Sequence, residues 1–363
     1  MVNILYVMPE FKLAGAETMC TTLASELSSK YHIIVASLYD INSSLIERMS
    51  ERGIKVVFLH KKRGLDLSII VKLAKLMKSE HIHVVHTHRY VMQYAIPAAC
   101  YSRVKVRIHT VHSIAKKEMG LFQRKLSNFF YKHCKVIPVA ISPIVKDTIL
   151  EEYGLRRNDV PMIYNGANIK NCIVKTDYTS NDQIRVLHVG RLTGVKNQSL
   201  LIEVIACLRD KGYKVTLDMY GDGEKKYEYQ EKIRALNLQG VACLRGLTDT
   251  IYPVMHNADI FVLPSIYEGM PMTLIEAMGT GLPIVASRVG GIPDMIDSGI
   301  DGLLVNPCFD ELYDGIEKIV RSCALRKYFG INAMRKSQMF SAEVMAEKYS
   351  DLYELGLKKV CNA

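Results

Sequence analysis

The run from Leu263 to Gly281, LPSIYEGMPMTLIEAMGTG, carries the residues whose types and spacing point most directly to chemistry. A buried strand is expected to end at Leu263 and a helix to begin at about Pro271, because proline suits the first helical position. The amides of Met272 and Thr273 then have no acceptor inside the helix, and the helix dipole adds partial positive charge there. This helix start is therefore predicted to bind an anion.

Two glutamates accompany this helix start. Glu268 lies in the turn before the helix, and Glu276 lies just over one turn inside it. A carboxylate at position 276 can accept hydrogen bonds from a vicinal diol such as that of a ribose. A pair of glutamates near a helix start is as often only a cap and a solvated helix face, so the pair alone leaves both interpretations open.

Two cations, Arg191 and Lys196, follow a predicted strand at residues 184–189 and flank a predicted helix start near Asn197. At that position they can neutralise a diphosphate as it becomes a leaving group. The alternative is that both are surface cations of a basic protein. Because residues 167–363 have a net charge of −1, the ligand-binding interpretation is favoured.

The first half of the chain offers a glycine and four histidines. Gly15 follows the first predicted strand, where a missing side chain lets the backbone approach a phosphate, although a lone glycine there is also ordinary turn geometry. The histidines form the clusters His86-Thr-His88 and His109-Thr-Val-His112. Strand alternation places His86 and His88 on one face, so spacing alone leaves a divalent metal site open. With no Asp, Glu or Cys close by in the sequence and no Asp-x-Asp motif, no metal is predicted.

These motifs together, in this order and spacing, resemble the large retaining glycosyltransferase family 4, which has the two-domain GT-B fold. The resemblance covers nearly the whole chain. Its strongest element is the pattern PS-x-x-EG-x-P…EA…G-x-P-I-V-A-S, in which the two glutamates are Glu268 and Glu276. The supporting pieces are AGAE at 14–17, HTVH at 109–112, YNGAN at 164–168, VGRLTGVKN at 189–197, YGDGE at 220–224 and VGGIP at 289–293.

The resemblance implies a role for each motif. His112 would face the donor sugar, Glu268 would contact its hydroxyl groups, and Arg191 and Lys196 would stabilise the departing diphosphate. The donor-binding residues it implies are Gly15, Arg191, Lys196, Gly221, Leu247, Glu268, Met270, Met272, Thr273 and Glu276. The family usually has two adjacent glycines where this chain has Ala14 and Gly15, so the backbone approach at position 14 is in question.

The mechanism is expected to be a same-face substitution that needs no metal and no cofactor. In it the departing phosphate assists deprotonation of the acceptor. Positioning and leaving-group stabilisation would then supply most of the rate. A double displacement would instead need a carboxylate nucleophile at the anomeric carbon, and the resemblance places Glu268 against sugar hydroxyls.

The elements that position these residues alternate between short β-branched runs and longer amphipathic segments, which predicts βαβ units on parallel sheets. Residues 1–166 are expected to form an N-terminal Rossmann-like acceptor-binding domain, 167–183 a polar linker, and 184–341 a C-terminal Rossmann-like donor-binding domain. A helix at about 342–363 is expected to pack back on the first domain. The fold class is thus α/β, with two parallel sheets facing across a cleft. Strands are predicted at 3–8, 32–38, 55–60, 83–87, 106–111, 135–141, 161–164, 184–189, 215–220, 241–244, 260–264, 283–287 and 302–305.

Composition narrows where the protein works. The nine cysteines are scattered with no Cys-x-x-Cys pair, and no run approaches the length of a membrane span, so a cytoplasmic protein is expected. The first six-residue apolar run lacks a basic lead and is interpreted as a strand, not a signal peptide. Residues 1–166 carry 24 Lys and Arg against 13 Asp and Glu, a net charge of +11. An anionic substrate or the anionic inner face of the plasma membrane would suit that half.

One segment of the first half, residues 116–135, is predicted to form a basic amphipathic helix. Its apolar face would comprise Phe122, Leu126, Phe129 and Phe130, and its cations, on the opposite side, would be Lys117, Arg124, Lys125, Lys132 and Lys135. Such a helix can lie on an anionic bilayer or receive a lipid-linked acceptor. It is equally the pattern of an ordinary helix that packs on a sheet, and the sequence leaves both open.

The predicted function is transfer of a sugar from a nucleotide-diphosphate donor, with a UDP-sugar favoured, to a glycan or polyprenyl-diphosphate-linked acceptor. The family members that the chain resembles serve bacterial capsule, exopolysaccharide or lipopolysaccharide assembly. A nucleotide-sugar epimerase of the same fold and a non-catalytic nucleotide-sugar binding protein are the alternatives. A dehydrogenase is disfavoured because the glycine motif at Gly221 and Gly223 is not completed at Lys226. Nucleic acid is not an expected partner, because no known module accompanies the charge.

Overall fold

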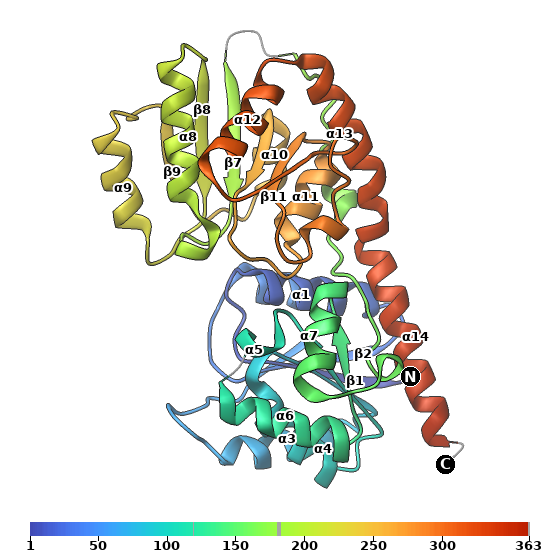
Figure 1. Cartoon of the computed structure of the whole chain (residues 1–363). Helices are drawn as coiled ribbons and strands as arrows, with labels where there is room; N and C mark the ends of the chain where they lie inside the picture. Colours follow the sequence, from blue (N-terminus) through green and yellow to red (C-terminus); the bar gives the residue numbers. More distant parts are fainter. Residues whose placement is uncertain (119, 180–182, 362–363) are drawn as a thin grey trace. The chain divides into compact units, whose positions relative to one another are not determined.

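The computed structural model describes residues 1–118, 120–179 and 183–361, which divide into two compact units. Unit 1 comprises Met1–Gly166 together with the segment that starts at Ala342, and unit 2 comprises Ala167–Ser341. Each unit contains one six-stranded parallel sheet with helices on its faces (Figure 1). The predicted α/β class with two Rossmann-like sheets is confirmed.

The sheet of unit 1 has the strand order β3-β2-β1-β4-β5-β6. Its central strands are apolar and buried on both faces, as parallel strands covered by helices must be. The strands are β1 (Asn3–Met8), β2 (His32–Ser37), β3 (Lys55–Phe58), β4 (Val84–His88), β5 (Val106–Val111) and β6 (Val136–Ala140). The helices are α1 (Gly15–Leu27), α2 (Ser44–Glu51), α3 (Ser68–Ser79), α4 (Met92–Tyr101), α5 (Ala115–Glu118), α6 (Leu121–His133), α7 (Pro143–Tyr153) and α14 (Ala342–Cys361), with 3₁₀ turns η1 (Arg89–Val91) and η2 (Arg157–Asp159).

Six of the seven strands predicted in the first half are confirmed to within two residues at each end. The seventh, at residues 161–164, is wrong, because Met162 makes only an isolated bridge with Ala140. Pro161 has no amide hydrogen and accepts from Ala140 N at 3.0 Å, while Ile163 N donates to Ala140 O at 2.9 Å. The segment therefore touches the sheet edge without extending the ladder.

Helix α14 belongs to unit 1, although all of unit 2 precedes it in the chain. It packs against α1, and its tyrosines reach the sheet. The hydroxyl groups of Tyr353 and Tyr6 lie 2.9 Å apart, and the Tyr31 hydroxyl lies 2.7 Å from Ser350 Oγ. These buried contacts join α14 to β1 and to the segment just before β2.

The sheet of unit 2 repeats the same order of strands, β12-β11-β10-β7-β8-β9. All six predicted strands are confirmed within two residues: β7 (Ile184–Val189), β8 (Val215–Tyr220), β9 (Ala242–Gly246), β10 (Ile260–Leu263), β11 (Ile284–Ser287) and β12 (Leu303–Val305). The helices are α8 (Gln198–Asp210), α9 (Lys226–Ala235), α10 (Ile251–Asn257), α11 (Met272–Thr280), α12 (Phe309–Val320) and α13 (Cys323–Ser337), with 3₁₀ turns η3 (Ile169–Asn171), η4 (Gly194–Lys196), η5 (Ile292–Asp294) and η6 (Gln338–Phe340).

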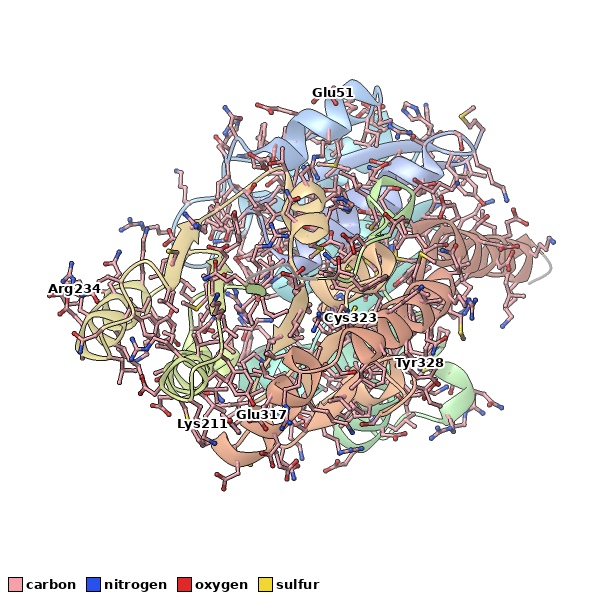
Figure 2. All side chains as sticks on the ribbon, turned by 90° about the horizontal axis from the view of Figure 1, so that it is seen from above. Glu51, Lys211, Arg234, Glu317, Cys323 and Tyr328 are labelled. Atoms are coloured by element: carbon pink, nitrogen blue, oxygen red, sulfur yellow. The ribbon has the colours of Figure 1, made fainter. Side chains whose placement is uncertain are left out.

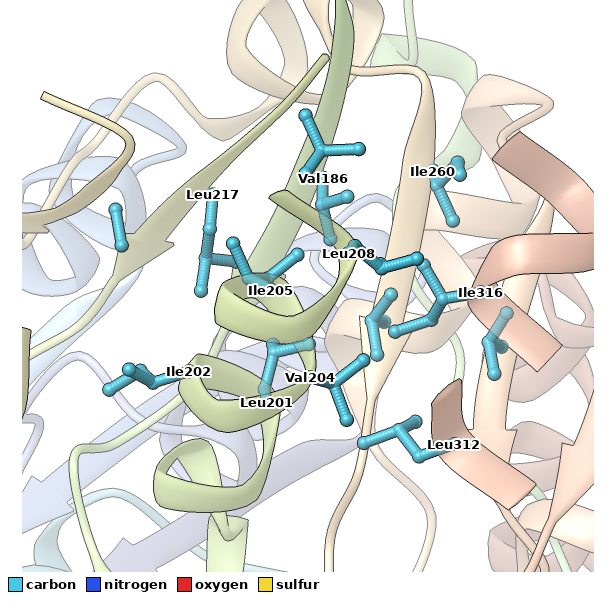
Figure 3. Close-up of a cluster of buried hydrophobic side chains, with 14 of the residues drawn as sticks. Val186, Leu201, Ile202, Val204, Ile205, Leu208, Leu217, Ile260, Leu312 and Ile316 are labelled. Atoms are coloured by element: carbon cyan, nitrogen blue, oxygen red, sulfur yellow. The ribbon is translucent and has the colours of Figure 1, made fainter. Parts of the chain in front are cut away.

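Helices α8 and α12 bury their apolar faces together against this sheet (Figure 3). Val204 and Ile205 of α8 and Ile316 of α12 are fully buried in this core. The two helices also meet just after the end of α8, close to Lys211 and Glu317 (both labelled in Figure 2). There the Lys211 ammonium lies 4.1 Å from the ring centroid of Tyr313, one turn before Glu317 on α12. A rigid α8 matters because the loop before it carries candidate site residues.

The segment predicted as a polar linker belongs to unit 2 from Ala167 onward. Lys175 Nζ is buried and donates to Ala258 O at 2.7 Å and to Asp259 Oδ1 at 3.2 Å. The Tyr178 hydroxyl donates to Gly281 O at 3.0 Å. Polar composition suggested a solvated segment, but these buried partners satisfy its polar groups on the domain. Residues 180–182 of the predicted linker lie outside the described residues.

The single amphipathic helix predicted for residues 116–135 is two helices, α5 and α6, and its faces differ from the prediction. Phe122 and Phe129 are exposed by 73% and 52%, beside Lys125 and Lys132 on the solvent side, whereas Phe130 is buried. Arg124 lies on the packed side and donates to Glu152 Oε1 at 2.7 Å. The packed side of α6 thus carries an ion pair with α7, and two of its aromatic rings face solvent. The Lys117 side chain lies outside the described residues.

Candidate functional site

In unit 2 the candidate residues gather where the strand order reverses direction. Strands β7 and β10 are neighbours in the sheet, and from them the order runs to β8 and β9 on one side and to β11 and β12 on the other. In open parallel sheets, ligands bind at the carboxyl ends of the strands at this switch point. Arg191 and Lys196 follow β7, and Glu268 follows β10. The topology therefore brings the cation motif and the glutamate motif together.

The two motifs meet in an ion pair. Lys196 Nζ donates to Glu268 Oε1 at 2.6 Å, and the same oxygen accepts from Ser265 Oγ at 2.7 Å. The two side chains are only 18% and 9% exposed, so water screens the pair little. The carboxylate fixes the ammonium group at one position at the edge of the sheet.

Backbone contacts hold the two loops together beside this ion pair. Asn197 adopts a left-handed conformation at φ 56°, caps the short η4 turn and donates from Nδ2 to Pro264 O at 3.2 Å. Ile266 N donates to Val195 O at 2.8 Å. Asparagine tolerates this conformation better than most residues. The position of Lys196 is thus set by backbone as well as by its charged partner.

A buried histidine and a buried glutamine support the Arg191 backbone. Gln198 Nε2 donates to Arg191 O at 2.8 Å and lies 3.1 Å from His188 Nε2. His188 Nδ1 donates to Val262 O at 2.9 Å, so His188 Nε2 is the acceptor for the glutamine. Burial lowers the pKa of His188 to about 4, with a smaller contribution from Lys196. The imidazole is therefore neutral at pH 7 and keeps both hydrogen bonds.

Two glycine contacts bring further loops against the candidate residues. Gly221 has φ 143°, and a Cβ there would lie 2.0 Å from Gly190 O; one at Gly223 would lie 2.4 Å from Leu192 O. The loop after β8 thus packs on the loop that carries Arg191. This contact gives Gly221 a structural role, and direct contact with a donor remains a prediction.

Gly290, in the loop after β11, makes a similarly close contact with the Glu268 turn. It has φ 56°, and a Cβ there would lie 1.7 Å from Glu268 O. Gly291 N donates to Gly269 O at 3.1 Å. No other residue fits at position 290 with this backbone, because both the conformation and the space exclude a side chain. The loop after β11 therefore supports the Glu268 turn from behind.

Helix α11 begins at Met272, one residue later than predicted, because Pro271 has the extended ψ of 122° and acts as the N-cap. Leu274 N donates to Pro271 O at 3.2 Å, which leaves the amides of Met272 and Thr273 at the helix start. The side chains of Met270 and Met272 are buried, and Glu276 is 9% exposed. The sequence therefore located the turn and helix correctly and misplaced only the proline.

Arg191 and Leu247 differ from their neighbours because their side chains are exposed. Leu247 follows β9 and is 62% exposed. Among the described residues, no hydrogen bond or ion pair engages the Arg191 guanidinium. Its backbone is fixed by Gln198, so the side chain can turn toward an incoming anion while its base stays in place.

In unit 1 the switch point lies between β1 and β4. Gly15 is the first residue of α1, the helix that follows β1, and Glu17 lies in the first turn of this helix. Arg89 follows β4 at φ 59° and donates from Nη1 to Glu17 Oε1 at 2.7 Å. Glu17 is 2% exposed, and burial raises its pKa against the opposing effect of Arg89. The pair fastens the loop after β4 to the helix that starts at Gly15.

His112 follows β5, beside the same switch point, and is half-buried. Its Nε2 lies 2.9 Å from His88 Nδ1. Burial lowers the pKa of His112 to about 3, and His109 and Arg89 lower it further. Burial likewise lowers the pKa values of His86, His88 and His109. This edge of unit 1 is therefore lined by neutral imidazoles.

A metal ion would need free ring nitrogens on these histidines, but several of the nitrogens take part in hydrogen bonds. His86 lies 2.7 Å from both the Tyr353 hydroxyl and Thr110 Oγ1, and His109 Nδ1 lies 2.9 Å from Thr87 Oγ1. Within the described ranges, no group of three or more His, Cys, Asp or Glu residues is arranged to hold a metal ion. Hydrogen bonding to one another and to hydroxyl groups accounts for the spacing of these histidines.

Several supporting residues escaped prediction from the sequence. They are Ser265, His188, Gln198, Glu17 and Arg89. Ser265 and Glu17 lie inside the motifs PS-x-x-EG and AGAE, but the sequence assigned them no role. The hydrogen bonds that give His188, Gln198 and Arg89 their roles form only in the folded chain. Gly290 could have been found, because the VGGIP motif was recognised as part of the pattern.

The comparisons with known proteins agree with this arrangement. Residues 175–336 match the family model of glycosyl transferases group 1, and residues 13–171 match that of glycosyltransferase family 4. The two matches cover both units, and the chain belongs to glycosyltransferase family 4.

Individual relatives are distant but extend over most of the chain. The amylovoran biosynthesis glycosyltransferase AmsD of Erwinia amylovora is 26% identical over 343 residues, which cover 93% of this chain and 95% of that protein. An Escherichia coli enzyme named UDP-Gal:alpha-D-GlcNAc-diphosphoundecaprenol alpha-1,3-galactosyltransferase is 28% identical over 267 residues, 66% of each chain.

Solved structures share the fold. Anabaena Alr3699/HepE, crystallised with UDP and glucose, superposes with a TM-score of 0.85 at 20% identity and covers 98% of this chain and all of its own. Sucrose-phosphate synthase from Thermosynechococcus elongatus gives a TM-score of 0.81 at 18% identity over 98% and 99% of the two chains. The chain therefore has the GT-B fold.

Proposed function

We propose that this protein transfers a sugar, with retention of anomeric configuration, from a UDP-sugar to a glycan or polyprenyl-diphosphate-linked acceptor in cell-surface polysaccharide biosynthesis. The observation that carries the proposal is the Lys196–Glu268 ion pair at the switch point of unit 2. It joins the predicted diphosphate cation to the turn that leads directly into α11. Unit 2 would then hold the donor, and unit 1 would receive the acceptor.

The donor diphosphate would be held by fixed positive charge. Lys196 is fixed by Glu268, Arg191 is available to turn, and the amides of Met272 and Thr273 add the partial charge of a helix start. Phosphate oxygens can replace solvent around these groups without rearranging the loops. The residues that lie close to this position, Met270 and Glu276, would contact the sugar or the ribose.

The proposed reaction is a same-face substitution. The bond between the anomeric carbon and the β-phosphate oxygen breaks, and UDP leaves while its developing charge is stabilised by Arg191 and Lys196. The acceptor hydroxyl oxygen bonds to the anomeric carbon on the same face, and its proton passes to the departing phosphate. In this scheme Glu268 positions sugar hydroxyls and Lys196, and His112 contacts the donor sugar. No metal is required, because side chains and helix amides supply the positive charge.

The choice of donor and acceptor rests on the relatives. The Escherichia coli relative is named for a UDP-galactose donor and a diphosphoundecaprenol-linked acceptor, and AmsD is named for amylovoran biosynthesis. The basic first half of this chain, with a net charge of +11 over residues 1–166, suits an acceptor that carries a diphosphate.

Donor binding and turnover can be tested in sequence. Thermal stabilisation of the full chain by UDP-glucose, UDP-galactose and UDP-N-acetylglucosamine identifies the donor, since a ligand at about 100 times its Kd adds about 2.7 kcal/mol. Turnover is then followed as UDP release with polyprenyl-diphosphate-linked sugars, and the product anomer is assigned by NMR. Arg191→Ala should lower kcat by about 10²–10³ by analogy with lost oxyanion donors.

The same assay separates the alternatives. An epimerase would convert one UDP-sugar into another and release no UDP when acceptor is present. A binding protein would be stabilised by the donor with no turnover of any kind. Retained activity in excess EDTA is expected, and a near-normal rate of Arg191→Ala would reject the assigned cation.

We also propose that the solvent face of α6 contacts an anionic membrane surface. Leu121 and Phe122 are exposed by 71% and 73%, and Phe129 by 52%, with the exposed Lys125 and Lys132 on the same helix. Exposed aromatic rings among cations suit the headgroup region of an anionic bilayer. In the described part of the chain, no helix is long and apolar enough to cross a membrane.

Vesicle flotation tests this contact. The full chain should float with phosphatidylglycerol vesicles at low salt, and less so at high salt, while neutral vesicles should not bind it. Phe122→Ser with Phe129→Ser should abolish flotation, whereas Tyr227→Ser, which removes an aromatic side chain of 72% exposure in unit 2, should not. Equal flotation of the double variant and the parent would contradict the proposal.

A further inference from the structure

A rigid polar network surrounds His88 in unit 1. His86, on the same face of β4, has both ring nitrogens engaged, Nδ1 with the Tyr353 hydroxyl and Nε2 with Thr110 Oγ1, each at 2.7 Å. Thr110 Oγ1 also lies 2.7 Å from the Tyr349 hydroxyl. All of these side chains are fully buried. The network therefore holds β4, β5 and α14 in one arrangement.

His88 lies against this network. Its ring is stacked on Tyr6, with a centroid separation of 6.0 Å and an interplanar angle of 16°, and lies 4.3 Å from the His86 ring. Within the described part of the chain, its one hydrogen bond joins Nδ1 to His112 Nε2 at 2.9 Å. Among the described residues, no atom pairs with His88 Nε2, which is buried. Among the described residues, the His88 ring thus has one hydrogen-bond partner, His112, which the proposed function places against the donor sugar.

The position of the proton follows from this geometry. Burial lowers the pKa values of both His88 and His112, so both rings are neutral and each carries a single N–H group. If His88 held its proton on Nε2, a buried N–H group would have no acceptor. With the proton on Nδ1, His88 donates to His112 Nε2, and only a lone pair is left unsatisfied. A buried orphan N–H is the rarer of the two cases.

We infer that His88 is a positioning residue that donates from Nδ1 to Nε2 of His112 and so keeps the proton of His112 on Nδ1. The second ring nitrogen of a histidine is commonly set in this way by the hydrogen bond that the first one makes. His112 then presents an N–H donor, suited to an oxygen atom of a sugar, and not a base. The inference rests on the proposed function only in giving His112 a sugar oxygen to contact.

The proton position can be measured in the resting protein. Two-bond ¹H–¹⁵N correlation spectra of the full chain labelled with [¹⁵N]histidine distinguish a ring protonated at Nδ1 from one protonated at Nε2. His112→Gln identifies the His112 signals. In the parent protein, His112 is expected to be protonated at Nδ1. A His112 ring protonated at Nε2 would overturn the inference whatever the activity of the enzyme.

Two variants of nearly equal size test the origin of this preference. In His88→Asn the side-chain amide lies near the former Nδ1 and can still donate to His112, whereas in His88→Gln it lies near the former Nε2. His88→Asn should keep His112 protonated at Nδ1, and His88→Gln should shift it at least in part to Nε2. His109→Gln is the matched control, because His109 is also fully buried but hydrogen bonds to Thr87. It should leave His112 unchanged, and equal spectra for all three variants would overturn the inference.

Activity gives the second measurement. His88→Gln should lower kcat/KM for the donor about tenfold, the equivalent of one lost hydrogen bond, and His88→Asn should restore most of it. A general structural defect would instead lower the melting temperature of both variants together, without rescue by asparagine. If His112→Gln is fully active, the proposed role of His112 fails, while the measured proton position still decides whether His88 orients it.

Discussion

Units 1 and 2 place their candidate residues at the same point of the same strand order, but they equip that point differently. Unit 2 keeps full charges there, since Lys196 and Glu268 form a pair with 18% and 9% exposure. At the corresponding edge, unit 1 has the neutral imidazoles of His88 and His112. Both strand orders run outward from the reversal between the first and fourth strands of the unit.

The proposed function gives this difference a reason, because it assigns a diphosphate to the edge of unit 2 and a sugar hydroxyl to that of unit 1. A diphosphate carries charge, so fixed cations beside it gain more from the interaction than they lose in hydration when they are partly buried. A sugar hydroxyl is neutral, and a buried charged group facing it would be costly. A neutral imidazole donates a hydrogen bond without that cost. Under the proposed function, the same topology would serve two ligand chemistries, one through permanent charge and one through a lowered histidine pKa.

A fall in pH should produce the largest difference between the two units, because it should destabilise unit 1 more than unit 2. The folded state keeps His86, His88, His109 and His112 neutral in unit 1, and His188 in unit 2, while the unfolded chain binds protons near pH 6.5. Stability is therefore complete above pH 6.5 and is lost as the pH falls toward 4. Below pH 6.5, each of these neutral histidines lowers the free energy of unfolding by up to about 1.4 kcal/mol per pH unit. Because His86, His88, His109 and His112 all lie in unit 1, that unit should open first.

Hydrogen exchange followed by mass spectrometry, corrected for the intrinsic rate at each pH, measures this order. Between pH 7 and pH 5, protection should fall in β4 and β5 before it falls in β7 and β10. His188→Gln should reduce the small pH response of unit 2 and leave that of unit 1 unchanged. A simultaneous loss in both units would show that the buried imidazoles do not set the difference.

Removal of the Lys196 ammonium should have the next largest effect. Lys196→Ala should lower kcat/KM about 10²–10³, because the proposed leaving-group cation is lost. Of the described hydrogen bonds to the Glu268 carboxylate, only that from Ser265 would then remain. Adding Glu268→Gln should cost less than the sum of the two single effects, since the unpaired charge disappears. Lys225→Ala, which breaks an exposed pair with Glu228, is the control and should leave turnover unchanged.

Substitution of Gly290 tests whether the loop after β11 is needed to support the Glu268 turn. Gly290→Ala places a methyl group against Glu268 O and strains a backbone at φ 56°, so about 1–3 kcal/mol of stability and most donor affinity should be lost. Gly240→Ala has comparable strain at φ 80° but no atom within 4 Å of the new Cβ. It should lose stability and keep its Kd for UDP, measured by calorimetry. Matching affinities would mean that the Glu268 turn does not depend on this contact.

Leu247→Ala should have the smallest effect. Its side chain is 62% exposed, so its removal takes away little packing within the protein. The KM for the donor should rise by less than about threefold, which is within about 0.6 kcal/mol. Steady-state kinetics with the stabilising UDP-sugar measures it. A tenfold rise would show that the leucine side chain itself packs on the base.

Much of the fold could be predicted because periodicity and turn residues are local signals. Strand β10 and the start of α11 were located within one or two residues by the apolar run before Leu263 and by Pro271. The predicted strand at 161–164 failed, because β-branched and aliphatic residues say nothing about whether a partner strand has free hydrogen bonds. The prediction of which faces of α6 are buried failed for a related reason, since Arg124 pairs with Glu152, 28 residues further along the chain.

The candidate site divides in the same way. Motif spacing predicted Arg191, Lys196 and Glu268, and the structure brings Lys196 and Glu268 together. The supporting partners Gln198, His188 and Ser265 were missed, because each acts through a hydrogen bond that only the folded chain creates. His88 was noticed for its spacing from His86 and interpreted as an open metal question, whereas the structure shows it bonded to His112.

The return of α14 to unit 1 has a consequence for synthesis of the chain. Tyr349 and Tyr353 secure Thr110 and His86, yet the ribosome makes them only after every residue of unit 2. The first sheet can form early as a nascent domain, but its histidine network must wait for the last helix to emerge. Translation thus imposes an order in which unit 1, although begun first, is completed after unit 2.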